Sequence, residues 1–592
     1  MAEPSTSNLT PLPSPATEPL PRAAVRWQER AVDAARVDAV AQGASLSQPV
    51  ARVLVGRGVV DDEAAQAYLV PQLKRLPDPA RLAGMDAALD RIVFAIDKGE
   101  TIGIFGDYDV DGVTSTVVLW DFLDALGAKA TATIPDRLLE GYGLNTAGVD
   151  RLAAQGCTLI ITVDCGVTAH EQVLYASGRG IDVVVIDHHT VPVELPKAVS
   201  VINPHRPDCT RGSEMLCAAG VTFNLCLALR RKMRERGFFN GSTHKEPDLK
   251  DALDLVALGT VADVVPLVGE NRVLVAGGLK LLKHARRPGL RALLDVAGEE
   301  AGMVDASTLG FQLGPRVNAA GRLGDAMHAV RLLRSSDDEL AFQMARRLDA
   351  ENRARRGIEK KIVEEAVRQI ESSEALRKAP VLVVGDEGWH PGVVGIVASR
   401  LVDRFGRPAV VVGEGGRGSG RSIERYHLYD ALRSVAHTLD GFGGHAHAAG
   451  VRVKKGAGGL DAFRDALIAH GEGALTADDL HKVIAYDGEL DTGTVDKNLI
   501  GALDAAAPFG RKNPEPVFLF RGVKATGVRE VGNAHVKAVV DTGRYLEMIA
   551  FGAAERIGEL AAPVDVLATP EINEFRGAST LQLRVRDFRA SR

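Results

Sequence analysis

Five apolar, β-branched runs recur between residues 101 and 202, and their spacing constrains the fold more than any other feature of the sequence. The runs end at Gly106, Ile134, Val163, Ile186 and Ile202, with stretches long enough for helices between them. Strands that alternate with helices predict βαβ units and therefore a doubly wound, mainly parallel α/β sheet. Open sheets of this kind bind ligands at the carboxyl ends of their strands. Function is therefore expected in the residues that follow each run.

Acidic residues and histidines follow three of these runs, and another acid interrupts a later apolar stretch. Burying several like charges is unfavourable unless cations neutralise them. Oxygen-rich sites with one or two imidazoles favour Mn²⁺ or Mg²⁺ over zinc. Two such ions, about 4 Å apart, can activate water and stabilise the leaving oxygen in phosphoryl transfer. The pattern therefore predicts a metal centre built from Asp107, Asp109, Asp111, Asp164, Asp187, His188, His189 and Asp263.

The loop from Asp107 to Gly112 also resembles the beginning of an EF-hand calcium loop. Its glycine has the right place, but no Glu occupies the twelfth position, and an apolar strand precedes the loop where an EF-hand needs a helix. A single Asp after a strand is more often a capping or turn residue, and a lone His-His pair is more often structural. The repetition at three strand ends is what favours a metal centre.

The remaining sequence divides by composition and periodicity. The Pro-rich, Ser-rich start is typical of a disordered tail. A long charged segment keeps helical spacing to about Glu371, and Ser336 with Glu339 is expected to form a capping box at its start. Short alternating runs near the end predict a small antiparallel barrel. The expected parts are a tail (1–24), a helical segment (25–79), a catalytic domain (80–332), a connecting helix (333–376), a second α/β domain (377–474) and the barrel (475–592).

Composition sets further limits. The formal net charge is only −6, so a site for nucleic acid needs a local concentration of positive charge. The five cysteines are an odd number without a C-x-x-C pair, which argues against a disulfide framework or a structural zinc and fits a reducing cytoplasm. No apolar run reaches the roughly 18 residues of a membrane span, and the N-terminus lacks the pattern of a secretory signal. We therefore expect a cytoplasmic location and no membrane partner.

Several ordered motifs give the sequence a specific resemblance. They include FGDYDVDGVTS, TVDCG, VIDHH, ALGTVADVVPL, GPRVNAAGRLGDA, HPGVVGIVASRL, GSGRS, FGGHAHAAG and NPEPVF. Together they resemble the DHH phosphoesterase superfamily, named for the triplet seen here as Asp187-His188-His189, and within it the RecJ family. The resemblance implies a DHH catalytic domain, a long connecting helix, a DHHA1 substrate-binding domain and a C-terminal OB-fold that binds nucleic acid.

The resemblance also implies roles for the acidic and histidine residues. Asp164 would bridge two metal ions, and His189 would orient the scissile phosphate or exchange a proton with it. Asp187 would support the histidines from behind, as metal-bound imidazoles usually require. The implied metal ligands are Asp107, Asp109, Asp111, Asp164, His188 and Asp263.

Basic and polar residues are expected to hold the nucleic acid. Arg forms forked hydrogen bonds with phosphate, and Gly-rich backbone can approach it closely. The resemblance assigns a 5′-phosphate site in a cleft between the two α/β domains to Arg316, Asn318, Arg322, Ser419 and Arg421. It assigns a substrate contact to His445, and contacts beside the cut to Arg137 and Tyr142. Candidate contacts on strands of the barrel are Lys524, Arg529, His535 and Lys537.

The implied function is a single-stranded-DNA exonuclease that works from the 5′ end, releases 5′-mononucleotides and takes part in recombination and repair. Expected partners are single-stranded DNA and, more weakly, a single-stranded-DNA-binding protein and a helicase. Three alternatives stay open. The first is a DHH phosphodiesterase that acts on short oligoribonucleotides, phosphoadenosine phosphate or cyclic dinucleotides. The others are a manganese pyrophosphatase and a non-catalytic scaffold that binds single strands. The family tends toward Gly where this sequence has Lys512, and toward Gly-Phe where it has Arg425-Tyr426.

Overall fold

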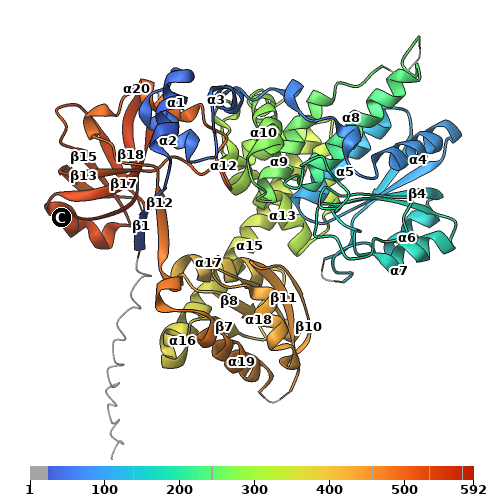
Figure 1. Ribbon diagram of the computed structural model, residues 1–592. Coiled ribbons are helices and arrows are strands. Elements are labelled where there is room, and N and C mark those ends of the chain that lie inside the picture. Colours follow the sequence, from blue (N-terminus) through green and yellow to red (C-terminus); the bar gives the residue numbers. More distant parts are fainter. Residues whose placement is uncertain are drawn as a thin grey trace, which may run out of the picture. The chain divides into compact units, whose positions relative to one another are not determined.

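The computed structural model describes residues 25–137, 139–241, 245–456, 458–532, 534–575 and 578–591 (Figure 1). The expected disordered tail, residues 1–24, lies outside the described residues. The described chain forms two compact units, and each is treated by itself below. One unit holds residues 354–484 together with the described residues 25 and 26, and the other holds residues 27–353 together with residues 485–592.

A five-stranded parallel sheet is the centre of the larger unit. The strand order is β3-β2-β4-β5-β6, and each pair of neighbours is parallel. The strands are β2 (Thr101–Gly106), β3 (Lys129–Thr133), β4 (Cys157–Val163), β5 (Asp182–Ile186) and β6 (Ser200–Ile202). The prediction of a parallel α/β sheet is confirmed, and four of the five strand ends fall on the expected residue; β3 ends one residue before Ile134.

Helices cover both faces of this sheet because successive strand residues point to opposite sides. Ile102, Ile104 and Ile161 pack in one core with helices α4, α5 and α8. Phe105 and Ile160 pack in another core with helices α6 and α7. The helices are α4 (Met85–Lys98), α5 (Val110–Ala125), α6 (Thr146–Ala154), α7 (His170–Gly178) and α8 (Ala218–Glu235). This is the doubly wound arrangement that the sequence predicts.

A helical layer continues the first of these cores. It comprises α9 (Leu253–Ala262), α10 (Gly269–Leu282), α11 (Pro288–Ala297), α12 (Ala306–Thr308), α13 (Gly314–Leu323) and α14 (Met327–Arg334). Helix α9 is apolar around most of its surface, because it packs between α5, α8 and α10. Its buried position carries Asp263, the residue that ends it, toward the parallel sheet.

The C-terminal part of the larger unit is a six-stranded sheet with the order β13-β17-β18-β16-β15-β14. Its strands are β13 (Phe518–Val523), β14 (Ala525–Val531), β15 (His535–Val540), β16 (Glu547–Ala550), β17 (Val564–Phe575) and β18 (Ala578–Ala590). All neighbours are antiparallel except β16 and β18, which are parallel. The predicted barrel is therefore present, and its strand β14, which carries Arg529, lies outside the alternating runs that predicted the barrel.

The N-terminal helices pack onto this barrel. They are α1 (Ala34–Gly43), α2 (Gln48–Val55) and α3 (Asp62–Leu69), and Val50 and Val53 of α2 are part of the barrel's buried core. Arg57 donates to both carboxylate oxygens of the buried Asp487, at 2.7 and 3.3 Å. Strand β1 (Val25–Glu29) pairs with β12 (Lys482–Tyr486). Helix α20 (Lys497–Asp504) lies before the barrel strands.

One buried arginine joins three parts of the larger unit. Arg272 on α10 donates to the carbonyls of Ala505, Ala506 and Ala507, which follow α20, and to the carbonyl of Tyr68 on α3. Its guanidinium also lies 4.0 Å from the centre of the Tyr68 ring. The catalytic sheet's helical layer, the N-terminal helices and the barrel thus share one hydrogen-bond network.

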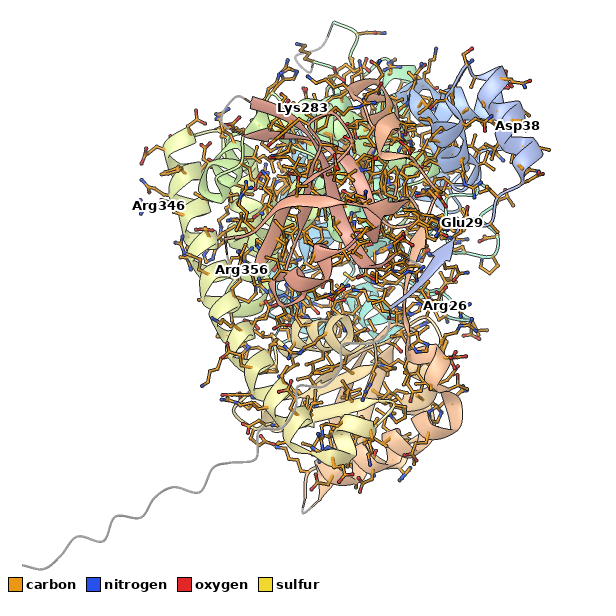
Figure 2. The ribbon with its side chains drawn as sticks, turned by 90° about the vertical axis from the view of Figure 1, so that its left-hand side faces the viewer. Arg26, Glu29, Asp38, Lys283, Arg346 and Arg356 are labelled. Carbon is orange, nitrogen blue, oxygen red and sulfur yellow. The ribbon has the colours of Figure 1, made fainter. Side chains whose placement is uncertain are left out.

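The long charged segment forms helix α15 (Asp338–Ser372), on which the exposed Arg346 and Arg356 are labelled in Figure 2. The predicted capping box at Ser336 and Glu339 is wrong by one residue. The carboxylate of Asp337 accepts from the Leu340 N–H at 2.8 Å, and a leucine cannot return the bond. The expected long helix itself is confirmed.

The smaller unit has a mixed sheet with the order β10-β11-β9-β8-β7, in which only β7 and β8 are parallel. Its elements are α16 (Glu374–Lys378), β7 (Leu382–Gly385), α17 (Val394–Phe405), β8 (Ala409–Val412), β9 (Arg417–Arg421), α18 (Leu428–Ser434), β10 (Leu439–Gly444), β11 (Ala448–Val453) and α19 (Gly459–Ala474). Ile362, Ala366 and Ile370 of α15 pack in its core. No helix in the described residues is long and apolar enough to cross a membrane.

Candidate metal centre

The acidic residues gather because three neighbouring parallel strands end at the same edge of the sheet. Asp107 follows β2, Asp164 follows β4, and Asp187 follows β5, and these strands are adjacent in the order β2-β4-β5. The Asp164 N–H donates to the Ile186 carbonyl at 3.0 Å, which holds the two neighbouring loops together. The site thus lies where open α/β sheets bind their ligands.

The loop between β2 and α5 turns sharply around its carboxylates. Asp109 is the N-cap of α5, and its Oδ1 accepts from the backbone N–H groups of Asp111 and Gly112. A Cβ on Gly112 would lie 2.4 Å from the Asp107 carbonyl oxygen, so only glycine allows this close approach. This strand–loop–helix geometry excludes the EF-hand alternative.

Asp111 is held by a helix far along the chain. Its Oδ2 accepts from the Ala218 N–H at 2.6 Å, and its Oδ1 accepts from the Ala219 N–H at 2.9 Å. These are the first amides of α8, where the helix dipole favours negative charge. No local sequence signal indicates this contact, because 107 residues separate Asp111 from Ala218.

Three overlapping groups of side chains could each hold a metal ion. They are Asp107, Asp109 and Asp164; Asp111, His188 and Asp263; and Asp164, His188 and His189, with candidate ligand atoms within 4.8 Å of one another in each group. The Nε2 of His188 lies 3.2 Å from Asp164 Oδ1 and 3.7 Å from Asp263 Oδ2. All six expected metal ligands are therefore close together, and Asp164 belongs to two of the groups.

The cluster contains buried polar atoms that make no hydrogen bond within the described residues. Asp107 Oδ1, Asp164 Oδ1 and His188 Nε2 are all buried without a hydrogen-bond partner. Burial, followed by the charges of Asp109 and Asp111, raises the pKa of Asp164 well above its usual value. Burial and the charge of Asp109 do the same to the pKa of Asp107. Such atoms are costly unless a cation binds them, so these residues fit divalent metal ions.

His188 is suited to bind a metal as a neutral imidazole. Burial, with a smaller contribution from His189, lowers the pKa of His188 to about 4. A neutral ring at physiological pH has a free nitrogen lone pair, which a metal requires. An oxygen-rich set with one imidazole agrees with the donors that Mn²⁺ and Mg²⁺ prefer.

His189 differs from His188 in its partners. Its Nδ1 lies 2.7 Å from Asp187 Oδ1, and that carboxylate also accepts from the backbone N–H groups of both histidines. Burial lowers the pKa of His189, but the hydrogen bond with Asp187 and the charges of Asp187, Asp109 and Asp107 together outweigh it, so the net shift of the pKa is upward. Burial likewise raises the pKa of Asp187, but the hydrogen bonds and charge of His189, together with the Val167 N–H, outweigh it, so the net shift of the pKa is downward. The pair therefore favours a protonated His189 with a fixed orientation.

Two tyrosines, Tyr108 and Tyr142, lie at the same edge of the parallel sheet, and the sequence predicted a role only for Tyr142. The Tyr142 hydroxyl donates to the Asp164 carbonyl at 3.1 Å and lies 3.1 Å from His189 Nδ1. Its half-exposed ring lies edge-on to Tyr108, with ring centres 6.5 Å apart. The Arg137 guanidinium lies 4.7 Å from the centre of the Tyr108 ring. Tyr108 was missed, although it stands between two of the predicted metal ligands in the sequence.

Three residues of α13 were expected to hold the 5′-phosphate, and they differ in how far they are buried. Arg316 is buried, and its Nε donates to Asp349 on α15 at 3.0 Å while Nη1 donates to the Gln312 carbonyl at 2.6 Å. A phosphate contact by Arg316 would compete with this ion pair. Asn318 and Arg322 are half-buried. The charge of Arg322 acts on the Tyr108 hydroxyl, so Arg322 lies toward this tyrosine.

In the smaller unit, Ser419 and Arg421 meet the start of a helix. Arg421 Nη1 donates to Ser419 Oγ at 3.0 Å. A Cβ on Gly395, at the first turn of α17, would lie 3.0 Å from Ser419 Oγ and 3.4 Å from Arg421 Nη2. Helix N-termini and arginines both favour phosphate. His445 lies in the turn before Ala448, whose Cα pairs with that of Arg421.

Two of the four expected contacts on the barrel, Lys537 and His535, have protein partners of their own. Lys537 Nζ lies 2.8 Å from Glu547 Oε2, and its Cα is opposite that of Arg529. His535 Nδ1 accepts from the Gly552 N–H, and its ring lies 5.1 Å from that of the exposed Phe551. Lys524 lies between β13 and β14 and on neither strand. The five cysteines are all buried and free.

Three segments match known family domains. Residues 101–260 match the DHH family, N-terminal domain, residues 378–470 match the DHHA1 domain, and residues 486–587 match the RecJ OB domain. These matches cover the parallel sheet, the mixed sheet and the barrel described above.

Curated relatives cover nearly all of the chain. It is 40% identical to the single-stranded-DNA-specific exonuclease RecJ of Dickeya dadantii, over 91% of this chain and 96% of the relative. The identity to the protein of the same name from Escherichia coli is 37%, over 91% and 95%. The structure of RecJ with Mn²⁺ from Thermus thermophilus superimposes with a TM-score of 0.81 and 29% identity, covering 96% of this chain and 80% of that one. The chain belongs to the RecJ family of single-stranded-DNA-specific exonucleases.

Proposed function

We propose that this protein hydrolyses the phosphodiester bonds of single-stranded DNA from the 5′ end and releases 5′-mononucleotides. The observation that carries the proposal is the cluster of buried, unsatisfied carboxylate and imidazole atoms at the ends of β2, β4 and β5. The relatives are named single-stranded-DNA-specific exonucleases, which gives the substrate class. The family relation and the complete set of acids and histidines argue against a non-catalytic scaffold.

The cofactor is Mn²⁺ or Mg²⁺, since solved RecJ structures contain each of these ions. We assign two ions to the cluster, held by Asp107, Asp109, Asp111, Asp164, His188 and Asp263. Bound there, divalent ions would lower the pKa of a water molecule and stabilise charge on the leaving oxygen.

The protein's own groups orient the substrate and handle a proton. Because Asp187 holds the Nδ1 side of His189, the Nε2 atom is the one available for proton exchange with the substrate. A raised pKa favours the protonated ring, which suits donation to the leaving 3′-oxygen or a hydrogen bond to the scissile phosphate. Tyr142 provides a half-exposed ring beside His189 for stacking against a base of any identity.

The direction of cleavage requires a site for the terminal phosphate. We assign this role to Ser419, Arg421 and the start of α17, which lie together in the smaller unit. His445, Asn318 and Arg322 are further candidate contacts, and Arg316 would contribute only if its ion pair with Asp349 opens. The barrel would keep the strand near the site through residues around Arg529 and His535.

The test follows labelled nucleotide over time. A strand labelled at its 5′-phosphate is incubated with Mn²⁺, beside a 3′-labelled strand, a duplex and the variant Asp164→Asn. Early release of labelled mononucleotide from the 5′-labelled strand, slow on duplex and absent in the variant, is the expected result. The matched control is Asp295→Asn, an exposed aspartate on α11, which should cleave normally.

Other outcomes would redirect the assignment. Cleavage confined to very short oligonucleotides would indicate the oligoribonuclease type of DHH phosphodiesterase. Strand binding without metal-dependent cleavage would refute the enzyme and leave a scaffold. For the cell, we propose a cytoplasmic role in DNA recombination and repair beside a single-stranded-DNA-binding protein and a helicase. Co-purification of the tagged protein with these two partners tests that association, and their absence would contradict it.

A further inference from the structure

A tight turn before the barrel lies against the metal centre's outer edge. The turn runs from Gly510 to Asn513, whose backbone groups bond each other at 2.8 and 3.1 Å. The carbonyl of Arg511, at its tip, accepts from the Leu267 N–H at 2.9 Å. Asn513 is fully buried, and its amide donates to the carbonyls of Ala506 and Pro508. The turn is therefore fixed at both its base and its tip.

The docking point is next to a metal-ligand candidate. Arg511 Nη1 donates to the carbonyl of Val264 at 3.4 Å, and Val264 directly follows Asp263. Asp263 Oδ2 lies 3.7 Å from His188 Nε2. The charge of Arg511 also acts on Asp263, where it lowers the carboxyl's pKa against the stronger effects of burial and Asp111. A cation from the barrel segment thus lies at the rim of the anionic cluster.

The backbone at this junction is strained on both sides. Val264 has φ 57° and Lys512 has φ 58°, and neither residue is a glycine. The left-handed region is especially unfavourable for a β-branched residue such as valine. A Cβ on Gly510 would lie 2.7 Å from Leu267, so the two segments approach each other closely. Strain that the surroundings hold in place often marks a functional position.

A cation is needed at this rim because the substrate is itself anionic. Single-stranded DNA must bring its phosphates toward several carboxylates, in a protein whose formal net charge is −6. Arg511 is exposed, and one weak bond to a carbonyl leaves most of the forked donors of its guanidinium open to a ligand. Arginine is well suited to a phosphodiester because its donors match two oxygens.

We propose that Arg511 binds a backbone phosphate of the DNA strand beside Asp263 and so positions the strand across the metal centre. The contact is independent of base sequence, since it involves only the phosphodiester. Because Arg511 lies in the turn from Gly510 to Asn513, this turn would be part of the substrate site as well as an anchor of the barrel. The inference rests on the proposed function, and its test distinguishes the two.

The test compares Arg511→Gln, Arg511→Lys and the control Arg36→Gln, which removes an equal charge from an exposed position on α1. The readouts are kcat and KM on a short and on a long single strand, their dependence on salt, the affinity for Mn²⁺ and the melting temperature. The glutamine variant should lower kcat/KM about ten-fold on both strands, as expected for one charge-assisted phosphate contact. The salt slope should become less steep by about 0.7.

The lysine variant should recover part of the loss, and the control and the Mn²⁺ affinity should stay at wild-type values. Three results would overturn the inference: a kcat/KM equal to wild type, an equal loss in the control, or a loss confined to the long strand. A weakened Mn²⁺ affinity in the glutamine variant would also refute it, because the role would then be structural. Failure of the proposed function is distinct, since the wild-type protein would then release no nucleotide.

Discussion

Removing one charge from the metal centre should change stability in opposite directions with and without metal. Asp164 is the most informative position, because its buried carboxylate belongs to two ligand groups and has an unsatisfied oxygen. Asparagine keeps its shape, and its side chain tolerates the left-handed backbone that Asp164 adopts at φ 64°. The variant Asp164→Asn therefore changes charge with little change in backbone.

The magnitude follows from Coulomb's law. Ligand atoms of Asp164, Asp107 and Asp109 lie within 4.8 Å of one another. At an effective dielectric constant of about 20, each like-charged pair at that distance costs about 3 kcal/mol when both groups are ionised. Protonation limits this cost, so we expect the chelated variant to be more stable than chelated wild type by about 1–3 kcal/mol at alkaline pH.

The pH dependence has a definite sign. Because the folded-state pKa of Asp164 is raised above its unfolded value, its contribution to stability is present at low pH and is lost as pH rises through the folded pKa. The advantage of the variant in chelator should therefore grow with pH. Saturating Mn²⁺ should reverse the order, since a ligand at about a thousand times its Kd adds about 4.1 kcal/mol to the wild type alone.

Thermal melts of both proteins give the melting temperature under four conditions: with chelator or with Mn²⁺, each at acid and at alkaline pH. The control Asp295→Asn should follow wild type throughout. The reasoning would be refuted if the variant melted below wild type in chelator at alkaline pH, or if Mn²⁺ stabilised both proteins equally.

Three other perturbations test separate contacts. Replacing Arg272 with Met removes its hydrogen bonds to four carbonyls and should lower the unfolding free energy by about 3–5 kcal/mol, measured by denaturant titration; a change below about 1 kcal/mol would contradict the network's role. Asp187→Asn should lower kcat about a hundred-fold by releasing His189, with Mn²⁺ affinity retained in a calorimetric titration; unchanged turnover would show that the histidine needs no such support. Gly395→Ala brings a methyl group within 3.4 Å of Arg421 and should reduce the preference for 5′-phosphorylated over 5′-hydroxyl strands in competition assays; an unchanged preference would exclude this position.

The sheet and its acidic edge were predictable because both depend on local pattern. Apolar runs end where a polar residue follows, so Asp107, Asp164 and Asp187 mark the strand ends directly. Parallel strands then bring those ends to one edge whatever the intervening sequence. The sequence predicted the N-cap of α15 one residue too early because Ser336 and Asp337 are both good capping residues. Only the structure shows that Asp337 accepts the capping hydrogen bond.

Contacts between distant segments were not predictable in the same way. The amides of Ala218 and Ala219 hold Asp111 without any side-chain signal. The buried ion pair between Arg316 and Asp349 is equally absent from the local sequence, where the Gly-rich context favours a phosphate role that stays a prediction. Strand β14 gives no alternating run of its own because both of its faces are largely exposed, which removes the alternation of apolar and polar residues.

The strained positions show why the metal centre needs the whole unit. Asp164 and Val264 both adopt left-handed backbone conformations, and each lies at or beside a ligand candidate. Such conformations persist only when neighbouring structure holds them. At Asp164 that structure is the adjacent strand, through the Ile186 carbonyl; near Val264 it includes the turn before the barrel, whose Arg511 carbonyl accepts from the Leu267 N–H. The first constraint is local to the sheet, whereas the second comes from a segment far along the chain, so the geometry around Asp263 depends on how the backbone of that turn docks.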